Sequence, residues 1–303
     1  MFYPGVMKRI SELFGDDYYI AFTGISEARL HVKIVPEGGI MDIQFTNPGA
    51  DYMIRQIMLP LSEGETAFWT EPLYHFYPEL DRDYAKSLPF PEKKSYIEHT
   101  LRAAYLKLAD TIDAKAALYA AYWAECRAQV TDALSEAFQV DCAGIFHDLR
   151  CNLSMSPIAP RYLQEKYFDV FYLNSEKGAI GSSIHEIIHF VWFYVWNQVF
   201  GDSYEEYERP SLKWILSEMV VESIMRDPRL CSINPYFPRE EGGCIYPYFF
   251  DLEAGGELAL TVLDQMYREQ PIEEFMKNSY AYCQKHETEI RRHIQEAEGG
   301  NMA

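Results

Sequence analysis

Three features of this 303-residue sequence predict a mainly helical α+β fold. From residue 94 onwards, long stretches combine strong helix formers with apolar residues that recur every three or four positions, which is the period of an α-helix. Shorter stretches at 18–22, 28–35 and 41–45 are rich in β-branched and aromatic residues, as strands are. The Pro-Glu-Gly-Gly sequence at 36–39 is typical of a hairpin turn between the last two stretches.

The length suits one large domain or two ordinary ones, and we predict a boundary between residues 93 and 94. Residues 1–93 form the predicted N-terminal α/β region, in which 47–91 are expected to be loops apart from a short helix at 52–58. Residues 94–303 form the predicted second domain. It begins with one long helix or two consecutive helices at 94–138, with a buried stripe expected at Leu101, Tyr105, Leu108 and Ile112.

Two further strands are predicted at 143–153 and 167–173, before a long apolar helix that extends to Phe200. The serines of the segment 178–183 are expected to cap the start of this helix. The next helix is predicted at 211–225, because it begins after Pro210 and ends before Pro228. Helices at 249–268 and 272–295 complete the predicted fold.

Charge and composition argue against several classes of function. The chain carries 27 basic and 46 acidic residues and a formal net charge of −19, so a nucleic-acid-binding surface is not expected. Its first residues lack the apolar core of a signal peptide. The apolar run at 187–200 is too short to cross a bilayer and contains Asn197 and Gln198. We therefore expect a cytoplasmic protein without a membrane segment.

The six cysteines occur without a Cys-x-x-Cys pair, so a cysteine-based structural zinc site is not expected. In a reducing compartment they are interpreted as small packing residues. The alternative is a cysteine nucleophile at Cys142, with His147 five residues later, but no other feature of the sequence supports it.

The most informative motif is His-Glu-Ile-Ile-His at 185–189, inside the long apolar helix. Side chains four residues apart on an α-helix lie on the same face, so His185 and His189 can reach one metal ion. Glu186 lies beside them and can serve as a base. The alternative is a pair of core histidines hydrogen-bonded to the backbone. Buried ionisable groups need partners, however, and a zinc ion would satisfy all three at once.

A hydrolytic zinc site uses three protein ligands and leaves one position for water, so a third ligand is needed. In the next helix an apolar stripe at helical spacing is interrupted by Glu218, which is therefore expected to face the core; its members are Trp214, Glu218, Val221 and Met225. Glu218 is the predicted third ligand. The alternative is that Glu218 and Glu222 form an ordinary solvated acidic pair.

A His-Glu-x-x-His helix followed by a helix with Glu and a second carboxylate one turn later resembles the gluzincin, or thermolysin-like, metallopeptidases. The resemblance covers about forty residues, and the chain departs from the family at Ser217, where Asn is frequent, and at Glu222, where Asp is more usual. It implies a zincin-like catalytic domain at 94–303 with the metal between two helices. It also implies that the zinc ligands are His185, His189 and Glu218. Glu186 is then the general base, and Glu222 is the outer carboxylate that accepts the ring N–H of a ligand histidine.

The resemblance further implies groups that contact the substrate. Negative charge that develops during peptide hydrolysis needs hydrogen-bond donors, and this family commonly uses a Tyr and a His located after the third ligand. The candidates here are Tyr248, with Tyr246 nearby, and His286, which shares a helix face with Tyr282. A solvent-facing His286 is the alternative. A strand edge at 168–174 is expected to bind extended peptide by backbone pairing.

The expected function is hydrolysis of peptide bonds in a peptide or protein substrate, with zinc as the cofactor and Glu186 as the general base. One alternative is a catalytically inactive zincin-like protein whose metal serves stability or partner binding. Another is a metal-free scaffold with core histidines. Cleavage preference, the choice between endo- and exopeptidase action, and oligomeric state do not follow from the sequence.

Overall fold

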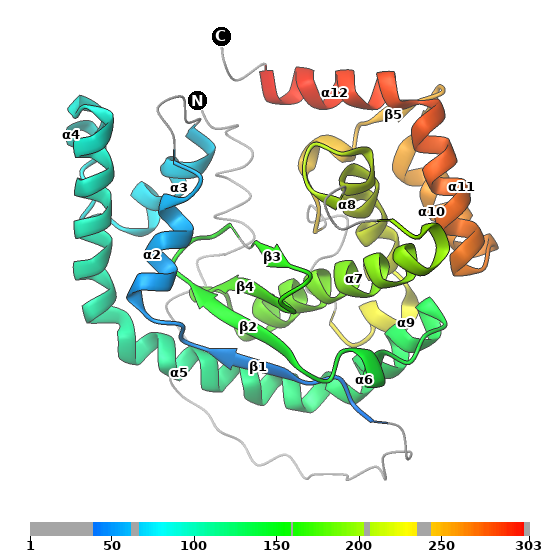
Figure 1. Ribbon diagram of the computed structural model, residues 1–303, viewed down its shortest axis with the longest axis horizontal. Coiled ribbons are helices and arrows are strands. Elements are labelled where there is room, and N and C mark those ends of the chain that lie inside the picture. Colours follow the sequence, from blue (N-terminus) through cyan, green and yellow to red (C-terminus); the bar gives the residue numbers. More distant parts are fainter. Residues whose placement is uncertain (1–38, 62–66, 159, 203–206, 235–243, 300–303) are drawn as a thin grey trace. The chain divides into compact units, whose positions relative to one another are not determined.

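The computed structural model describes residues 39–61, 67–158, 160–202, 207–234 and 244–299 of the chain (Figure 1). The chain divides into two compact units, each assembled from separate stretches of sequence. Of the described residues, unit 1 holds those within 43–123 and 149–179, and unit 2 holds those within 39–42, 124–148 and 180–299. The predicted boundary after residue 93 stays a prediction. The strands predicted at 18–22 and 28–35, and most of the turn predicted at 36–39, lie outside the described residues.

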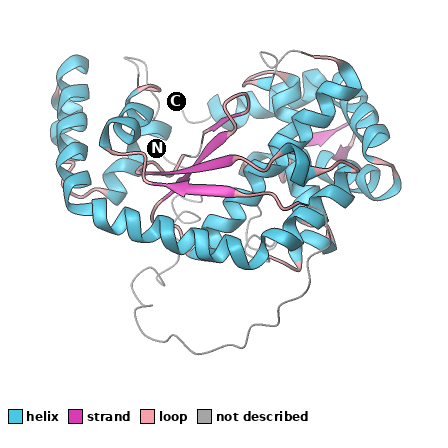
Figure 2. Cartoon of the chain, turned by 60° about the horizontal axis from the view of Figure 1, so that its bottom comes forward, coloured by secondary structure: helices cyan, strands magenta, loops and turns pink. Residues whose placement is uncertain are grey.

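The fold is mainly helical α+β, and unit 1 contains a mixed four-stranded sheet of order β1-β2-β4-β3 (Figure 2). Strand β1 (Ile43–Thr46) is parallel to β2 (Leu149–Ser154), and β2 is parallel to β4 (Tyr167–Phe171). The short β3 (Arg161–Tyr162) is antiparallel to β4. The strands predicted at 41–45 and 167–173 are thus confirmed.

Two sequence expectations about these strands are wrong. The strand predicted at 143–153 begins only at Leu149, because residues before it form the helical turn α6 (Cys142–Ile145), which is capped by the Asp141 side chain accepting from Gly144 N. The segment 168–174 is also not an edge strand. β4 lies inside the sheet, with β2 on one side and β3 on the other, and Asp169 N donates to Pro160 O at 3.0 Å. The first residues of the segment are therefore already paired on both sides within the sheet.

Four helices of unit 1 lie in the first half of the sequence. They are α2 (Ala50–Met58), α3 (Ala67–Phe76), α4 (Arg82–Ser87) and α5 (Phe90–Phe138), whose last part belongs to unit 2. The helix predicted at 52–58 is confirmed, but the loops predicted over the rest of 47–91 are wrong where α3 and α4 form. Helix α4 starts because the Asp81 side chain accepts from Tyr84 N at 2.9 Å, which satisfies a free N–H of the first turn.

The single long helix α5 confirms one of the two arrangements expected for 94–138. Of its expected stripe, Leu101 and Ile112 are fully buried, whereas Tyr105 and Leu108 are only half-buried. Further along the helix the Tyr119 hydroxyl donates to the backbone oxygens of Tyr172 and Asn174. These bonds tie α5 to the segment that follows β4.

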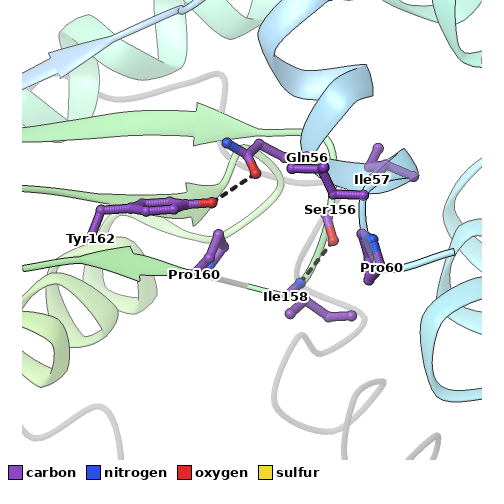
Figure 3. Close-up of a pocket in the computed structure, with 8 residues that line it drawn as sticks. Gln56, Ile57, Pro60, Ser156, Ile158, Pro160 and Tyr162 are labelled. Carbon is purple, nitrogen blue, oxygen red and sulfur yellow. Dashed lines mark hydrogen bonds between the residues drawn. The ribbon is translucent and has the colours of Figure 1, made fainter. Parts of the chain in front are cut away.

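Unit 1 also contains a pocket of about 340 Å³ between the end of α2 and the connection from β2 to β3 (Figure 3). Its wall is largely apolar, with Ile57, Pro60 and Ile158 on either side. The Tyr162 hydroxyl donates to Gln56 Oε1 at 2.8 Å at one end of the pocket. None of the site residues predicted from the sequence lines it.

Unit 2 is built mainly of helices. After α7 (Glu176–Phe200), which begins in unit 1, they are α8 (Leu212–Met225), α9 (Pro228–Cys231), the 3-10 turn η4 (Pro247–Phe249), α10 (Ala259–Glu269), α11 (Ile272–Lys285) and α12 (Glu287–Gly299). The helix predicted at 249–268 is correct only for its second half, because a small hairpin of β5 (Glu253–Ala254) and β6 (Glu257–Leu258) precedes α10. The segment predicted as one helix at 272–295 forms α11 and α12, which meet at His286.

Helices α7 and α8 form the centre of unit 2. The side chains of α7 from Ile184 to Trp196 are almost all buried, and every residue of α8 is buried where it packs against α10 and α11. The helix predicted at 211–225 is confirmed, and Ser211 caps it by accepting from Trp214 N at 3.1 Å. The capping expected from the serines of 178–183 is wrong, because α7 starts earlier and Ser175 Oγ accepts from Gly178 N.

The apolar helices of unit 2 also bear on the question of a membrane span. Among the residues that the structure describes, no helix combines the length and the apolarity that crossing a bilayer requires.

Candidate metal centre

Helix α7 places the two motif histidines on one face. His185 and His189 are one turn apart, and their Nε2 atoms are 3.1 Å from each other. The ring of His189 is fully buried and stacks on Phe193, which in turn stacks on Tyr207. His185 keeps part of its side chain exposed. One imidazole is therefore held in the core and the other lies at its border.

Helix α8 brings a carboxylate to the same point. Glu218 Oε1 is 3.5 Å from His189 Nε2, and Glu218 Oε2 is 3.9 Å from His185 Nε2. One ligand atom from each of the three residues lies within 4.8 Å of the other two, and these residues could hold a metal ion. The expectation that Glu218 faces the core is confirmed, since only 4% of the residue is exposed. The alternative of a solvated carboxylate at this position is wrong.

The spacing of these atoms suits a small tetrahedral ion. Bonds of about 2.0–2.1 Å to such an ion place neighbouring ligand atoms about 3.3–3.4 Å apart. The two histidine nitrogens are 3.1 Å apart, and the two Glu218 oxygens lie 3.5 Å from His189 Nε2 (Oε1) and 3.9 Å from His185 Nε2 (Oε2), so these distances lie around that value. Two imidazole nitrogens and a carboxylate oxygen are also a donor set that zinc accepts.

Glu186 lies beside the triad on α7. Its Oε1 is 3.9 Å from His185 Nε2, and only 5% of the residue is exposed. A carboxylate in such a position is close enough to exchange a proton with a molecule bound next to the histidines. Its place on the helix, one residue after the first ligand, is the one that the motif predicts.

Glu222 is also buried, with 1% of the residue exposed, so it is not solvated. Its Oε2 accepts from the thiol of Cys244, with the sulfur 3.7 Å away. Burial and the neighbouring carboxylates of Glu222 and Glu218 raise the pKa of this thiol well above its usual value, so the sulfur keeps its proton. The predicted bond from a ligand histidine to Glu222 remains a prediction.

Cys244 is the residue of this region that sequence reasoning missed. The sequence indicates only a packing residue at this position. Cys244 lies 22 positions after Glu222, and that separation matches no helical or strand period that would predict a contact between them. Ser217, where the chain departs from the gluzincin pattern, bonds within its own helix, because its hydroxyl donates to Trp214 O at 2.8 Å.

Tyr248, one of the two predicted donors to the transition state, contacts residues outside the triad. Tyr248 lies in η4 and stacks on Tyr246, and its backbone oxygen is 2.7 Å from His293 Nε2. Tyr246 packs against Trp214, one helical turn before Glu218. The segment that carries both tyrosines therefore packs against α8.

His286 lies at the C-terminal end of α11, where it packs against Tyr282 and the turn at Gly255. Its Nδ1 is 3.3 Å from Glu289 Oε1, and its side chain is 11% exposed, so the solvent-facing alternative is wrong. The contacts that the structure gives it do not include a triad residue. Its role as a donor to the substrate stays a prediction.

Comparison with known proteins adds no relative. No protein family matches the chain, and neither a curated protein nor a solved structure matches it.

Proposed function

We propose that the chain is a zinc-dependent metallopeptidase that hydrolyses peptide bonds in peptides or proteins. The observation that carries this proposal is the convergence of His185, His189 and Glu218 within 4.8 Å, with Glu186 next to them. These are the ligand types and the base of a hydrolytic zinc site with three protein ligands.

The chemistry follows from the charges of these groups. Zinc held by His185, His189 and Glu218 would lower the pKa of water and polarise the carbonyl of the substrate. Glu186 accepts the proton of the attacking water and passes it to the leaving amine. Because Glu186 and Glu218 are nearly buried, their charges are little screened by solvent and act strongly on a substrate beside them.

The exposed part of His185 supports access of a substrate to this site. His189 is closed off by its aromatic neighbours, so a peptide would approach from the His185 side. Tyr248 and His286 are the proposed donors to the developing oxyanion.

The decisive test replaces Glu186 by Gln in the full-length chain. The amide keeps the size of the side chain but cannot take the proton from water, so we expect zinc content to stay the same and cleavage of a mixed peptide library to fall at least about a hundredfold. Glu176→Gln, the same change in the first turn of the same helix, should leave both properties unchanged.

The outcomes separate the functions. Zinc binding without cleavage by the parent chain would favour a catalytically inactive metal-binding protein. Equal cleavage by Glu186→Gln and the parent would show that another group is the base.

A further inference from the structure

The segment 244–249 contacts α8 at two places. At one place the Cys244 sulfur is 3.7 Å from Glu222 Oε2. At the other the Tyr246 ring packs edge-on against Trp214, with ring centroids 5.6 Å apart. Along α8 these two contact points are eight residues apart, which corresponds to about 12 Å of helix.

Glu218 lies midway between the two contacts. Trp214, Glu218 and Glu222 follow one another at intervals of four residues, so they share one face of α8. The segment therefore runs along the metal-binding face of the helix, in the direction opposite to the helix, and touches it one turn before and one turn after the ligand.

Glu222 is the residue that the segment contacts at the first of these places. It is a carboxylate with 1% exposure, one turn from a second buried carboxylate, and a buried charge without a hydrogen bond is costly. The Cys244 thiol supplies such a bond from outside the helix.

We propose that Cys244 is a positioning residue of the metal centre: its thiol donates to Glu222, fixes that carboxylate on the face that carries Glu218, and anchors the segment with Tyr246 beside the site. This inference rests on the proposed function, because it takes the triad to bind zinc. Cys244 does not belong to the group of ligand atoms itself. It acts through Glu222.

The test measures zinc affinity of the full-length chain by competition with a chelator. Cys244→Ala and Cys244→Val both remove the donor, and Val also fills the space, so each should weaken zinc binding by about twofold to tenfold, the scale of one hydrogen bond. Cys244→Ser keeps a donor and should restore most of the affinity. Cys283→Ala, a change of a buried cysteine elsewhere in the same unit, should leave zinc affinity unchanged.

A spectrum of the cobalt-loaded protein distinguishes positioning from direct ligation. We expect no thiolate-to-cobalt charge-transfer band, and a band that disappears in Cys244→Ser would overturn the inference by making Cys244 a ligand. Unchanged zinc affinity in the Ala and Val variants, with zinc still bound by the parent, would also overturn it while leaving the proposed function in place. A parent that binds neither zinc nor cobalt would overturn both.

Discussion

A histidine and three glutamates around the candidate site in unit 2 are almost completely buried. They are Glu186, His189, Glu218 and Glu222, and none of them is more than 5% exposed. A buried ionised group costs several kcal/mol unless it is paired. A divalent cation held by His185, His189 and Glu218 would offset part of that cost, which is the role that the proposed function gives these residues in an otherwise apolar core.

At the same scale, Glu222→Ala should weaken zinc binding by about 10-fold to 100-fold, as is typical when a ligand loses its hydrogen-bonded neighbour. The reason is that Glu222 is buried on the face of α8 that carries Glu218. Chelator competition measures the effect, with the exposed Glu274→Ala as the control. Identical affinities for Glu222→Ala and the parent would remove Glu222 from the site.

The triad could be predicted from the sequence because its cues are local. The spacing of His185 and His189 and the apolar stripe around Glu218 are both readable within one helix. Cys244 could not be predicted in the same way. Its contact with Glu222 depends on how the chain returns to α8, and no pattern in the sequence encodes that return.

At the scale of elements, the long periodic helices can be predicted from the sequence, whereas the short helices α3 and α4 cannot. α7 and α8 have apolar residues on nearly every face, which marks them as buried. α3 contains Pro72, and α4 has only six residues, so neither shows a clear helical pattern in a segment rich in Pro and acidic residues. The prediction that β4 lies at a sheet edge is wrong, because the order of strands in a sheet depends on contacts between distant segments.

The β5–β6 hairpin gives a prediction about His286. Gly255 has φ +66, and a Cβ there would lie 2.6 Å from His286 Cε1. Gly255→Ala should therefore lower the free energy of unfolding by about 1–3 kcal/mol through backbone strain and displacement of the ring. Urea denaturation measures this loss. In a His286→Ala background, Gly255→Ala should cost less unfolding free energy than it does in the parent, because the ring is gone. If the effects of the two substitutions on the unfolding free energy simply add, the ring and the turn do not clash.

The sheet of unit 1 gives a prediction about pH. Burial raises the pKa of Asp169 from 3.8 to about 7, although its Oδ1 accepts from the Tyr52 hydroxyl at 2.7 Å and from Asn152. The folded state therefore holds a proton that the unfolded chain releases above about pH 4. Titration of Asp169 should therefore lower the free energy of unfolding as pH rises from about 4 to about 7, by on the order of 1 kcal/mol for each pH unit. Above about pH 7 this contribution should stay constant.

Asp169→Asn tests this assignment because the amide has the shape of the protonated acid and does not titrate. Urea denaturation of the variant and the parent at pH 5 and pH 8 gives the comparison. The variant should gain stability relative to the parent at pH 8. A difference between the two proteins that is the same at both pH values would contradict a raised pKa at Asp169.

At the scale of the whole molecule, each unit combines segments that are far apart in the sequence. Composition along the chain does not reveal such an arrangement, because the pairing of β1 with β2 joins residues separated by more than a hundred positions. The three candidate metal ligands, by contrast, all belong to unit 2, on two consecutive helices. The candidate site is therefore the part of the molecule that depends least on long-range assembly.

Metal content tests the central claim most directly. Elemental analysis of protein purified without added metal should find one zinc per chain in the parent, because three ligand atoms converge at one point. After dialysis, His185→Ala and His189→Ala should each lose that zinc while keeping the helical circular dichroism of the parent. A parent without zinc, or stoichiometric zinc in both folded histidine variants, would contradict the account.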